Sequence, residues 1–244
     1  NIFTFNMQKA TFDNPKVRQA VSYAFDYEGV KNNVYNGQAT VPSGFMPANF
    51  AEHNENIPEQ KQDIEKAKQL MKESGVGSCE IKVHLCEGSD DQVQMAQILQ
   101  ANLAEIGITV KIEIMPWTSL VEENTSPETA PEMSALNMGA FTGDAAFFLK
   151  QNFHSINSGG SYNWSFYEKP EFDKLLNDAA ATVDTDKKTE LLKQAQQMLV
   201  DDCVAVFAAS PNTVEAINNT YKGYVLHPLD YFYSIRFYQL TVDK

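Results

Sequence analysis

Residues 79–114 read CEIKVHLCEGSDDQVQMAQILQANLAEIGITVKIEI, and this stretch decides the fold class. Its first part alternates apolar and polar residues through Ile81, Val83 and Leu85, which predicts a strand. Residues 90–106 then place apolar side chains at helical spacing until Gly107 ends the pattern, and residues 108–114 alternate again. A strand, a helix of about four turns and a second strand form a βαβ unit. The two strands are therefore expected to be parallel neighbours.

Helices are also expected on the amino-terminal side of this unit. Pro15 suits a first helical turn, and Asp13 or Asn14 can cap it, so a helix is predicted over residues 13–25. A short helix over 27–35 and a helix over 63–74 follow. Residues 38–60 contain several prolines and glycines and are interpreted as an irregular surface segment.

The same alternation continues on the carboxyl-terminal side. The expected elements are a short helix over 117–123, a strand over 134–140, a helix over 144–151, helices that begin near 170 and 185, a strand over 204–208 and a last strand around 231–237. Helices and strands alternate without an internal repeat, which predicts an α/β fold.

The composition excludes two classes of partner. Lys and Arg number 19 against 32 Asp and Glu, so the formal net charge is −13. Nucleic acids and anionic membranes require a basic surface, and neither is expected as a partner. No apolar run approaches the ~18 residues of a membrane helix. The chain opens on a strand-like sequence without a leader, so we expect a fragment cut from a longer precursor.

The three cysteines give no disulfide framework. Cys79 and Cys86 flank the predicted strand, which would hold their sulfurs too far apart to bond, and Cys203 has no evident partner. An odd number in no recognisable pattern also gives no metal spacing. All three are predicted to be free thiols.

No catalytic or cofactor motif is present. The sequence contains no phosphate-binding glycine loop and no nucleophile elbow. The four histidines are scattered without metal spacing, and the acidic pairs at 90–91, 122–123 and 201–202 are interpreted as structural. We expect no metal, no cofactor and no enzymatic activity. A hydrolase or a structural surface protein is the remaining alternative class, but no nucleophile is paired with a base.

Several segments together resemble a signature of the family 5 solute-binding proteins, the peptide- and nickel-binding components of ABC importers. They are FNM at 5–7, FDNPKVRQAVSYAFD at 12–26, YNGQA at 35–39, residues 67–75 and 103–110, YEKPEFDKLL at 167–176, residues 194–202 and YKGY at 221–224. Each piece is short, but they follow one another in order over almost the whole chain.

The resemblance implies a fold and a domain organisation. Family members have two lobes that close over ligand and are about twice as long as this chain. Residues 1–244 are thus expected to form a single α/β ligand-binding lobe of the type II periplasmic-binding-protein kind, with a mixed sheet flanked by helices. Residues 1–9 and about 205–244 would be crossover segments toward the other lobe. The implied location is extracytoplasmic, either periplasmic or as a cell-surface lipoprotein.

The resemblance also implies a ligand-binding carboxylate. Peptide binders of the family carry a Gly-Trp-x-x-Asp motif whose aspartate pairs with the α-ammonium of the peptide, and residues 140–144, AFTGD, fit that position. Asp144 would then receive an ammonium group through a charge-assisted bond. The alternative is that Asp144 only caps the helix over 144–151, and both roles can coexist.

Three departures from the family bear on the ligand. Phe141 replaces the tryptophan, residues 145–147 replace a second aspartate and a proline, and the acidic loop 87–91 replaces the arginine that clamps the carboxylate of a dipeptide. A longer peptide and another amine-bearing ligand are therefore both candidates for the ligand. The runner-up interpretation is a non-peptide solute such as nickel or a metal chelate, an opine or a sugar.

Further candidate contacts are placed by the resemblance around Asp144. They are Phe141, Thr142, Tyr162, Asn163 and Phe207. Trp117 is a further candidate, as an exposed aromatic surface, and a core role is the alternative for Trp117 and Phe207. The expected partners are a peptide or other small solute and the permease subunits of an ABC transporter, with the protein itself a monomer.

Overall fold

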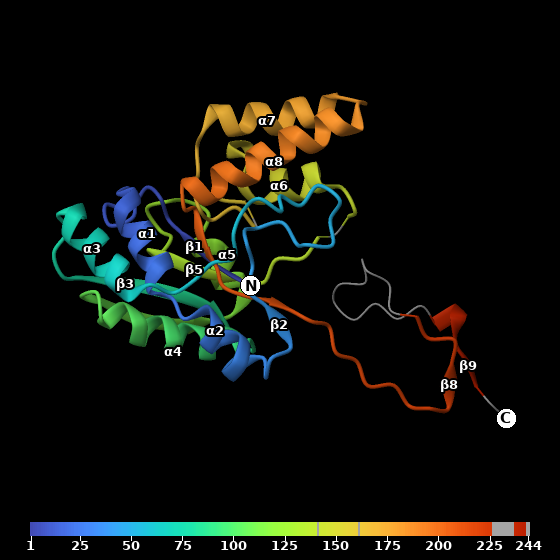
Figure 1. Cartoon of the computed structure of the whole chain (residues 1–244). Coiled ribbons are helices and arrows are strands. Elements are labelled where there is room, and N and C mark those ends of the chain that lie inside the picture. The colour runs from blue at the N-terminus through green and yellow to red at the C-terminus, as the bar shows by residue number, and fades with distance from the viewer. Residues whose placement is uncertain (141, 161, 226–236, 243–244) are drawn as a thin grey trace.

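A five-stranded sheet organises the chain (Figure 1). The computed structural model describes residues 1–140, 142–160, 162–225 and 237–242. The strands lie in the order β4-β3-β5-β1-β6, with the bounds β1 Ile2–Phe5, β3 Cys79–Cys86, β4 Ile108–Met115, β5 Met133–Leu136 and β6 Ala205–Phe207. The expected α/β class is confirmed.

The βαβ unit forms as its sequence predicts. β3 pairs with β4 in parallel from Cys79 opposite Ile108 to Cys86 opposite Met115, and β5 joins the other side of β3, also in parallel. β1 is antiparallel to both β5 and β6. The sheet is therefore mixed, as expected, and β6 runs in the same direction as β5.

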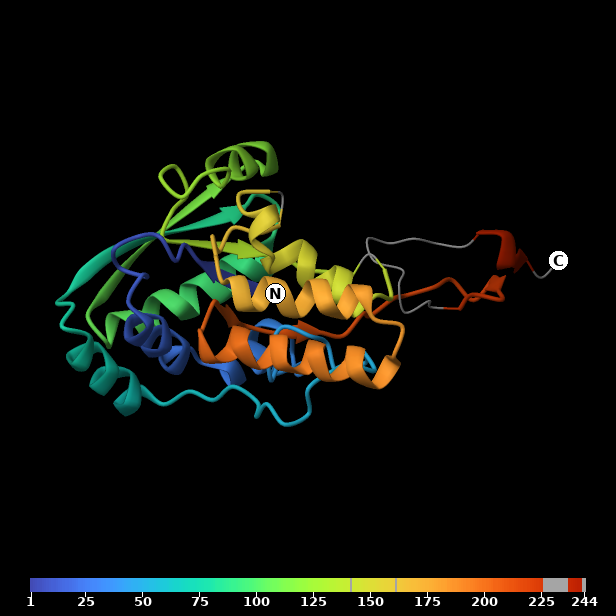
Figure 2. The same ribbon diagram turned by 90° about the horizontal axis from the view of Figure 1, so that it is seen from above.

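Helices cover both faces of the sheet. On one face lie α1 (Pro15–Ala24), α3 (Ile64–Ser74) and α4 (Asp90–Ala104). On the other lie α5 (Trp117–Glu123), α6 (Ala145–Phe153), α7 (Pro170–Ala181) and α8 (Thr185–Asp201), with α7 and α8 side by side (Figure 2). The remaining short elements are α2 (Tyr27–Gly29), the π-helical turn η1 (Val30–Val34), the 3₁₀ turns η2 (Ser155–Asn157) and η3 (Phe237–Gln239), and the strands β2 (Ala39–Thr40), β7 (Ser210–Pro211), β8 (Tyr221–Lys222) and β9 (Thr241–Val242).

The central strands are buried on both faces, with side chains that alternate between two apolar clusters. Phe3 and Phe5 of β1 point into the cluster under α1, α3 and α4, whereas Ile2 points into the cluster under α6, α7 and α8. On β6, Val206 joins the first cluster and Phe207 the second. This period of two is what a pleated strand imposes, and it gives the lobe two cores on one sheet.

Residues 38–60 correct one expectation. The segment is irregular apart from β2, as predicted, but it is not a surface segment, because Val41, Phe45, Met46 and Ile57 are buried. The ring of Phe45 stacks on Phe148 of α6 with centroids 4.7 Å apart. The apolar side chains within this proline-rich stretch fix it against the second core. The last expected strand falls largely on residues 226–236, which lie outside the described residues.

The buried guanidinium of Arg18 joins the two layers of helices. Its donors reach the carbonyl oxygens of Phe12 (2.6 Å) and Asp13 (3.2 Å) before α1, and those of Asp202 (2.8 Å from Nη2) and Cys203 (3.2 Å) after α8. The last turn of α8 and the start of β6 are thereby held against the start of α1. Tyr167 and Lys169 in turn bond the Asp202 carboxylate, each at 2.6 Å.

Replacing Arg18 by methionine is expected to lower the free energy of unfolding by about 2–5 kcal/mol. The physical reason is that several buried carbonyl groups lose their donors while the side-chain volume is largely kept. Urea unfolding followed by circular dichroism measures the change.

The matched control is Lys16→Met on the same helix. Lys16 forms an exposed ion pair with Glu73, 3.0 Å apart, and its loss is expected to cost less than about 1 kcal/mol. Equal costs for the two variants would contradict the assigned role of Arg18.

Candidate functional site

The strand directions gather the candidate residues at one edge of the sheet. β3, β4, β5 and β6 end there and β1 begins there, because β1 is antiparallel to its two neighbours. We call this the carboxyl edge. Trp117 follows β4 directly, and the loop 137–144 follows β5. In open α/β sheets ligands bind beyond the carboxyl ends of the strands, so this edge is where a site is expected.

A hollow of about 380 Å³ opens at the carboxyl edge. It is bounded by the start of β1 and the end of β6, by residues 40–48 of the irregular segment, and by Met138 and Phe148 beside α6. We call it the edge hollow. Phe207, one of the predicted contacts, is buried and lines it. Its wall is largely apolar, with His53, Glu55 and Glu59 as the ionisable groups of the irregular segment.

Asp144 lies at the start of α6. It is the N-cap residue, and its Oδ1 accepts a hydrogen bond from the amide of Phe147 at 3.0 Å. Its Oδ2 lies 3.3 Å from Nζ of Lys188 on α8, and its side chain is 49% exposed. Phe148, one turn further along α6, lines the hollow, whereas Asp144 does not. The capping role is therefore present, and the carboxylate remains partly open to solvent.

The local environment keeps the Asp144 carboxylate ionised. Partial burial acts to raise its pKa, but the hydrogen bond from the Phe147 amide and the Lys188 ammonium outweigh burial and lower the pKa below the ordinary aspartate value. A carboxylate in this state can accept an ammonium group of a ligand.

Trp117 belongs to an aromatic group at the same edge. It is the first residue of α5 and is 42% exposed, so it is not a core residue. Its ring lies 6.5 Å from that of Tyr162 and 5.6 Å from that of the buried Trp164. The structure thus brings two predicted contacts, Trp117 and Tyr162, together over a third aromatic residue that the sequence analysis did not single out.

The other predicted contacts are placed differently. Thr142 is exposed, and its hydroxyl accepts a hydrogen bond from the Asp144 amide at 3.3 Å, which shapes the turn before α6. Asn163 is fully buried; its amide donates to the carbonyl of His154 and its oxygen accepts from the Ser165 hydroxyl. Asn163 therefore holds its loop in this lobe. Phe141 lies outside the described residues.

Sequence reasoning missed Lys188 and the apolar residues Phe45 and Met46 of the irregular segment. Lys188 lies 44 positions from Asp144, and no local pattern connects them. Phe45 and Met46 did carry a signal, because adjacent apolar residues between prolines are expected to find a buried surface.

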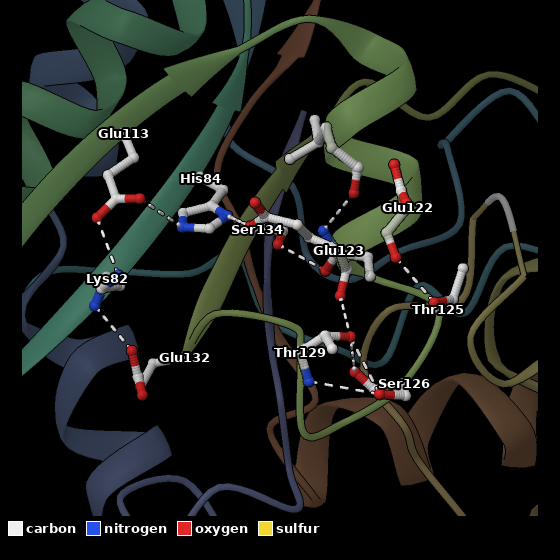
Figure 3. A network of polar contacts seen from close by, with 12 residues as sticks. Lys82, His84, Glu113, Glu122, Glu123, Thr125, Ser126, Thr129, Glu132 and Ser134 are labelled. Carbon is white, nitrogen blue, oxygen red and sulfur yellow. Dashed lines mark hydrogen bonds and ion pairs between the residues drawn. The ribbon is translucent and has the colours of Figure 1, made fainter.

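A second polar group surrounds His84 of β3 (Figure 3). His84 is 3% exposed. Its Nε2 lies 3.2 Å from Glu113 of β4 and its Nδ1 lies 3.0 Å from Glu123 of α5. Glu113 also pairs with Lys82 at 3.1 Å. A neutral imidazole has one N–H for two carboxylates, so this arrangement depends on the protonation state of His84.

A Ser–His–Asp grouping near the end of α6 is not arranged for catalysis. Asp173 contacts both partners: it accepts hydrogen bonds from the amide and the hydroxyl of Ser155, and lies 3.3 Å from Nδ1 of His154. A nucleophile requires histidine, not aspartate, as its direct neighbour. Here His154 Nδ1 accepts from the amide of Ile156 at 3.2 Å. The group fixes the 3₁₀ turn instead.

The described residues contain neither a metal-ligand cluster nor a membrane-spanning helix. Within residues 1–140, 142–160, 162–225 and 237–242, no three His, Cys, Asp or Glu side chains are placed to hold a metal ion. None of the helices in the described ranges combines the length and the apolar character needed to cross a bilayer. The three cysteines are free thiols in the structure.

Comparison with known proteins identifies relatives over the whole chain. The profile of the bacterial extracellular solute-binding proteins, family 5 Middle, matches residues 1–160. A dipeptide-binding protein of Escherichia coli is 29% identical over 231 residues, which cover 93% of this chain and 43% of that protein. Heme-binding protein A of Haemophilus influenzae is 30% identical over 249 residues, covering 98% of this chain and 44% of that protein.

The fold is shared with a solved structure. An ABC transporter-associated periplasmic binding protein of Helicobacter pylori, in complex with the peptide STSA, superposes with a TM-score of 0.85 at 26% identity. The match covers all of this chain and 47% of that one. The expected type II periplasmic-binding-protein fold is confirmed, and the chain spans less than half the length of the curated relatives that it matches.

The His84 group predicts a pH-dependent stability. Burial lowers the pKa of His84 below its ordinary value, although Glu123 and Glu113 act in the opposite direction. Between the lowered pKa and the unfolded value of about 6.5, the unfolded state binds the proton and the folded state does not. Stability is therefore expected to fall as the pH is lowered below about 6.5 toward the folded-state pKa, by at most about 1.4 kcal/mol per pH unit from this residue.

His84→Gln is expected to flatten this dependence, because the neutral amide does not titrate. Urea unfolding at several pH values between about 7 and 5 measures the slope, as protons bound per unfolding event. A variant whose slope equals that of the wild type would show that His84 is not the titrating group.

Proposed function

This chain belongs to family 5 of the bacterial extracellular solute-binding proteins, and on that premise we propose that it is one ligand-binding lobe of a receptor for peptides. The receptor would hold its ligand in a cleft between two lobes and deliver it to the permease subunits of an ABC importer. The observation that carries the proposal is the half-exposed, ionised carboxylate of Asp144, one helical turn before Phe148, which lines the edge hollow.

The domain organisation that we propose is two-lobed, with residues 1–9 and about 205–244 as crossover segments. The start of β1 and the end of β6 lie side by side, with the amide of Ala208 donating to the carbonyl of Asn1 at 3.0 Å. Beyond β7, the described chain leaves the body of the lobe and extends away from it (Figure 1). A second lobe at this position would face the carboxyl edge and close over the hollow by a hinge motion.

The chemistry of the edge suits an extended ligand with an amino group. Asp144 would bind the ammonium, Trp117 and Tyr162 would contact side chains, and Phe207 would form the floor of the hollow. The acidic loop 87–91 supplies no clamp for a ligand carboxylate, and Asp91 already accepts a hydrogen bond from the Tyr35 hydroxyl at 2.8 Å. Peptides longer than two residues, bound through their backbone groups, therefore fit better than dipeptides.

A non-peptide solute is the second candidate. The observation that favours it is the loss of the indole and of the arginine clamp, and one relative at 30% identity is named for binding heme. We further propose that the protein is a monomer without enzymatic activity and lies outside the cytoplasm, in the periplasm or as a lipoprotein. The named relatives are binding proteins, which supports the non-enzymatic part.

Asp144→Asn in the full-length protein is expected to weaken the binding of peptides with free amino termini by about 2 kcal/mol or more. Asparagine keeps the N-cap but loses the charge, so folding is preserved. Asp144→Ala is expected to lose the same affinity and about 1 kcal/mol of stability as well. Isothermal titration calorimetry against a pool of unblocked tri- to pentapeptides measures the change.

Asp63→Asn is the matched control. Asp63 caps α3 through the amide of Lys66 at 2.9 Å, on the opposite face of the sheet, and its substitution should leave the affinity unchanged. Peptide affinity at the wild-type level in Asp144→Asn would overturn the role given to Asp144. Absence of peptide binding by the wild type, together with a co-purified non-peptide mass in native mass spectrometry, would favour the second candidate.

A further inference from the structure

Asp144 already has a cationic partner from its own chain. Nζ of Lys188 lies 3.3 Å from Oδ2, the oxygen that the Phe147 amide does not use. Both oxygens of the carboxylate therefore have a donor before any ligand arrives. Lys188 occupies the kind of position that the ammonium group of a ligand would take.

The packing of the helices holds this pair in place. Phe148 lies one turn after Asp144 on α6, and Leu192 lies one turn after Lys188 on α8; both are buried in the same apolar cluster. The Lys188 side chain is itself only 26% exposed, so its aliphatic part is covered. Lys150 of α6 bonds Asn177 of α7 instead. The position of Lys188 beside Asp144 thus follows from the packing of α6 and α8 into one apolar cluster.

The ion pair with Lys188 changes the affinity of the Asp144 carboxylate for ligands that carry an ammonium group. A carboxylate offers about four acceptor directions, so a ligand ammonium can still approach it. The approaching charge is attracted by Asp144 and repelled by Lys188, so the net attraction is smaller than that of Asp144 alone. Without Lys188 the Asp144 carboxylate would act on the ligand with its full negative charge.

We propose that Lys188 is a specificity-determining residue that reduces the preference of the site for ligands with a free ammonium group. The proposal rests on the proposed function, because it requires Asp144 to face the ligand. Lys188 competes with the ligand ammonium for Oδ2 and so brings the affinities for amino-terminal-free and amino-terminal-blocked peptides closer together. It also keeps the carboxylate oriented when the cleft is empty.

The test compares Lys188→Gln with Lys187→Gln, the same change at the adjacent exposed lysine, in the full-length protein. The probes are a pool of tri- to pentapeptides with free amino termini and the same pool after amino-terminal acetylation. Lys188→Gln is expected to tighten binding of the free pool about twofold to fivefold at low ionic strength, less at high salt, and to leave the acetylated pool unchanged. Lys187→Gln should leave both pools unchanged, and adding Asp144→Asn should abolish the gain.

Three results would overturn the proposal: unchanged or weaker binding of the free pool by Lys188→Gln, an equal change for both pools, or a gain that persists in the Asp144→Asn background. The last two would mean that Lys188 acts through the fold and not through the charge at Asp144. Failure of the wild type to bind either pool is a different outcome, because it removes the proposed peptide function and the role of Lys188 with it.

Discussion

The guanidinium of Arg18 is the constraint on which the arrangement of the lobe depends. One planar group, buried at the junction of the two helical layers, satisfies carbonyl groups before α1 and after α8. α1 lies on one face of the sheet and α8 on the other, so this group sets where β6 starts beside β1. A guanidinium suits this position because its fork of donors meets several carbonyl oxygens at once.

The placement of β1 and β6 in turn creates the carboxyl edge. β1 lies antiparallel between β5 and β6, so its beginning meets the ends of the other strands. The edge hollow lies at this meeting point, while Trp117 begins the helix that follows β4 and Asp144 caps the helix that follows β5. A ligand site at this edge can be formed by residues from several segments of the chain. The strand order and directions bring these segments to the same edge of the sheet.

Much of the fold was predictable because its signals are local. The βαβ unit, the cap at Asn14 and the helix starts at Pro15 and Pro170 follow from periodicity and from the chemistry of single turns. For residues 38–60, the prolines and glycines correctly indicated the absence of regular structure. The burial of Phe45 against Phe148 could not be predicted, because it depends on a helix about 100 residues further along the chain. Capping by Asp144 was predictable for the same local reason.

The sequence by itself determined the α/β class, most helix and strand positions and, through ordered short motifs, the family. Only the tertiary structure decided which candidate residues meet: Trp117 with Tyr162, Asp144 with Lys188, and Phe207 with the edge hollow, while Asn163 turned inward. The physical reason is the sequence separation over which each kind of signal acts. Periodicity and capping act over a few residues, whereas the partner of a side chain depends on how separate helices pack across the sheet, which no window of sequence contains.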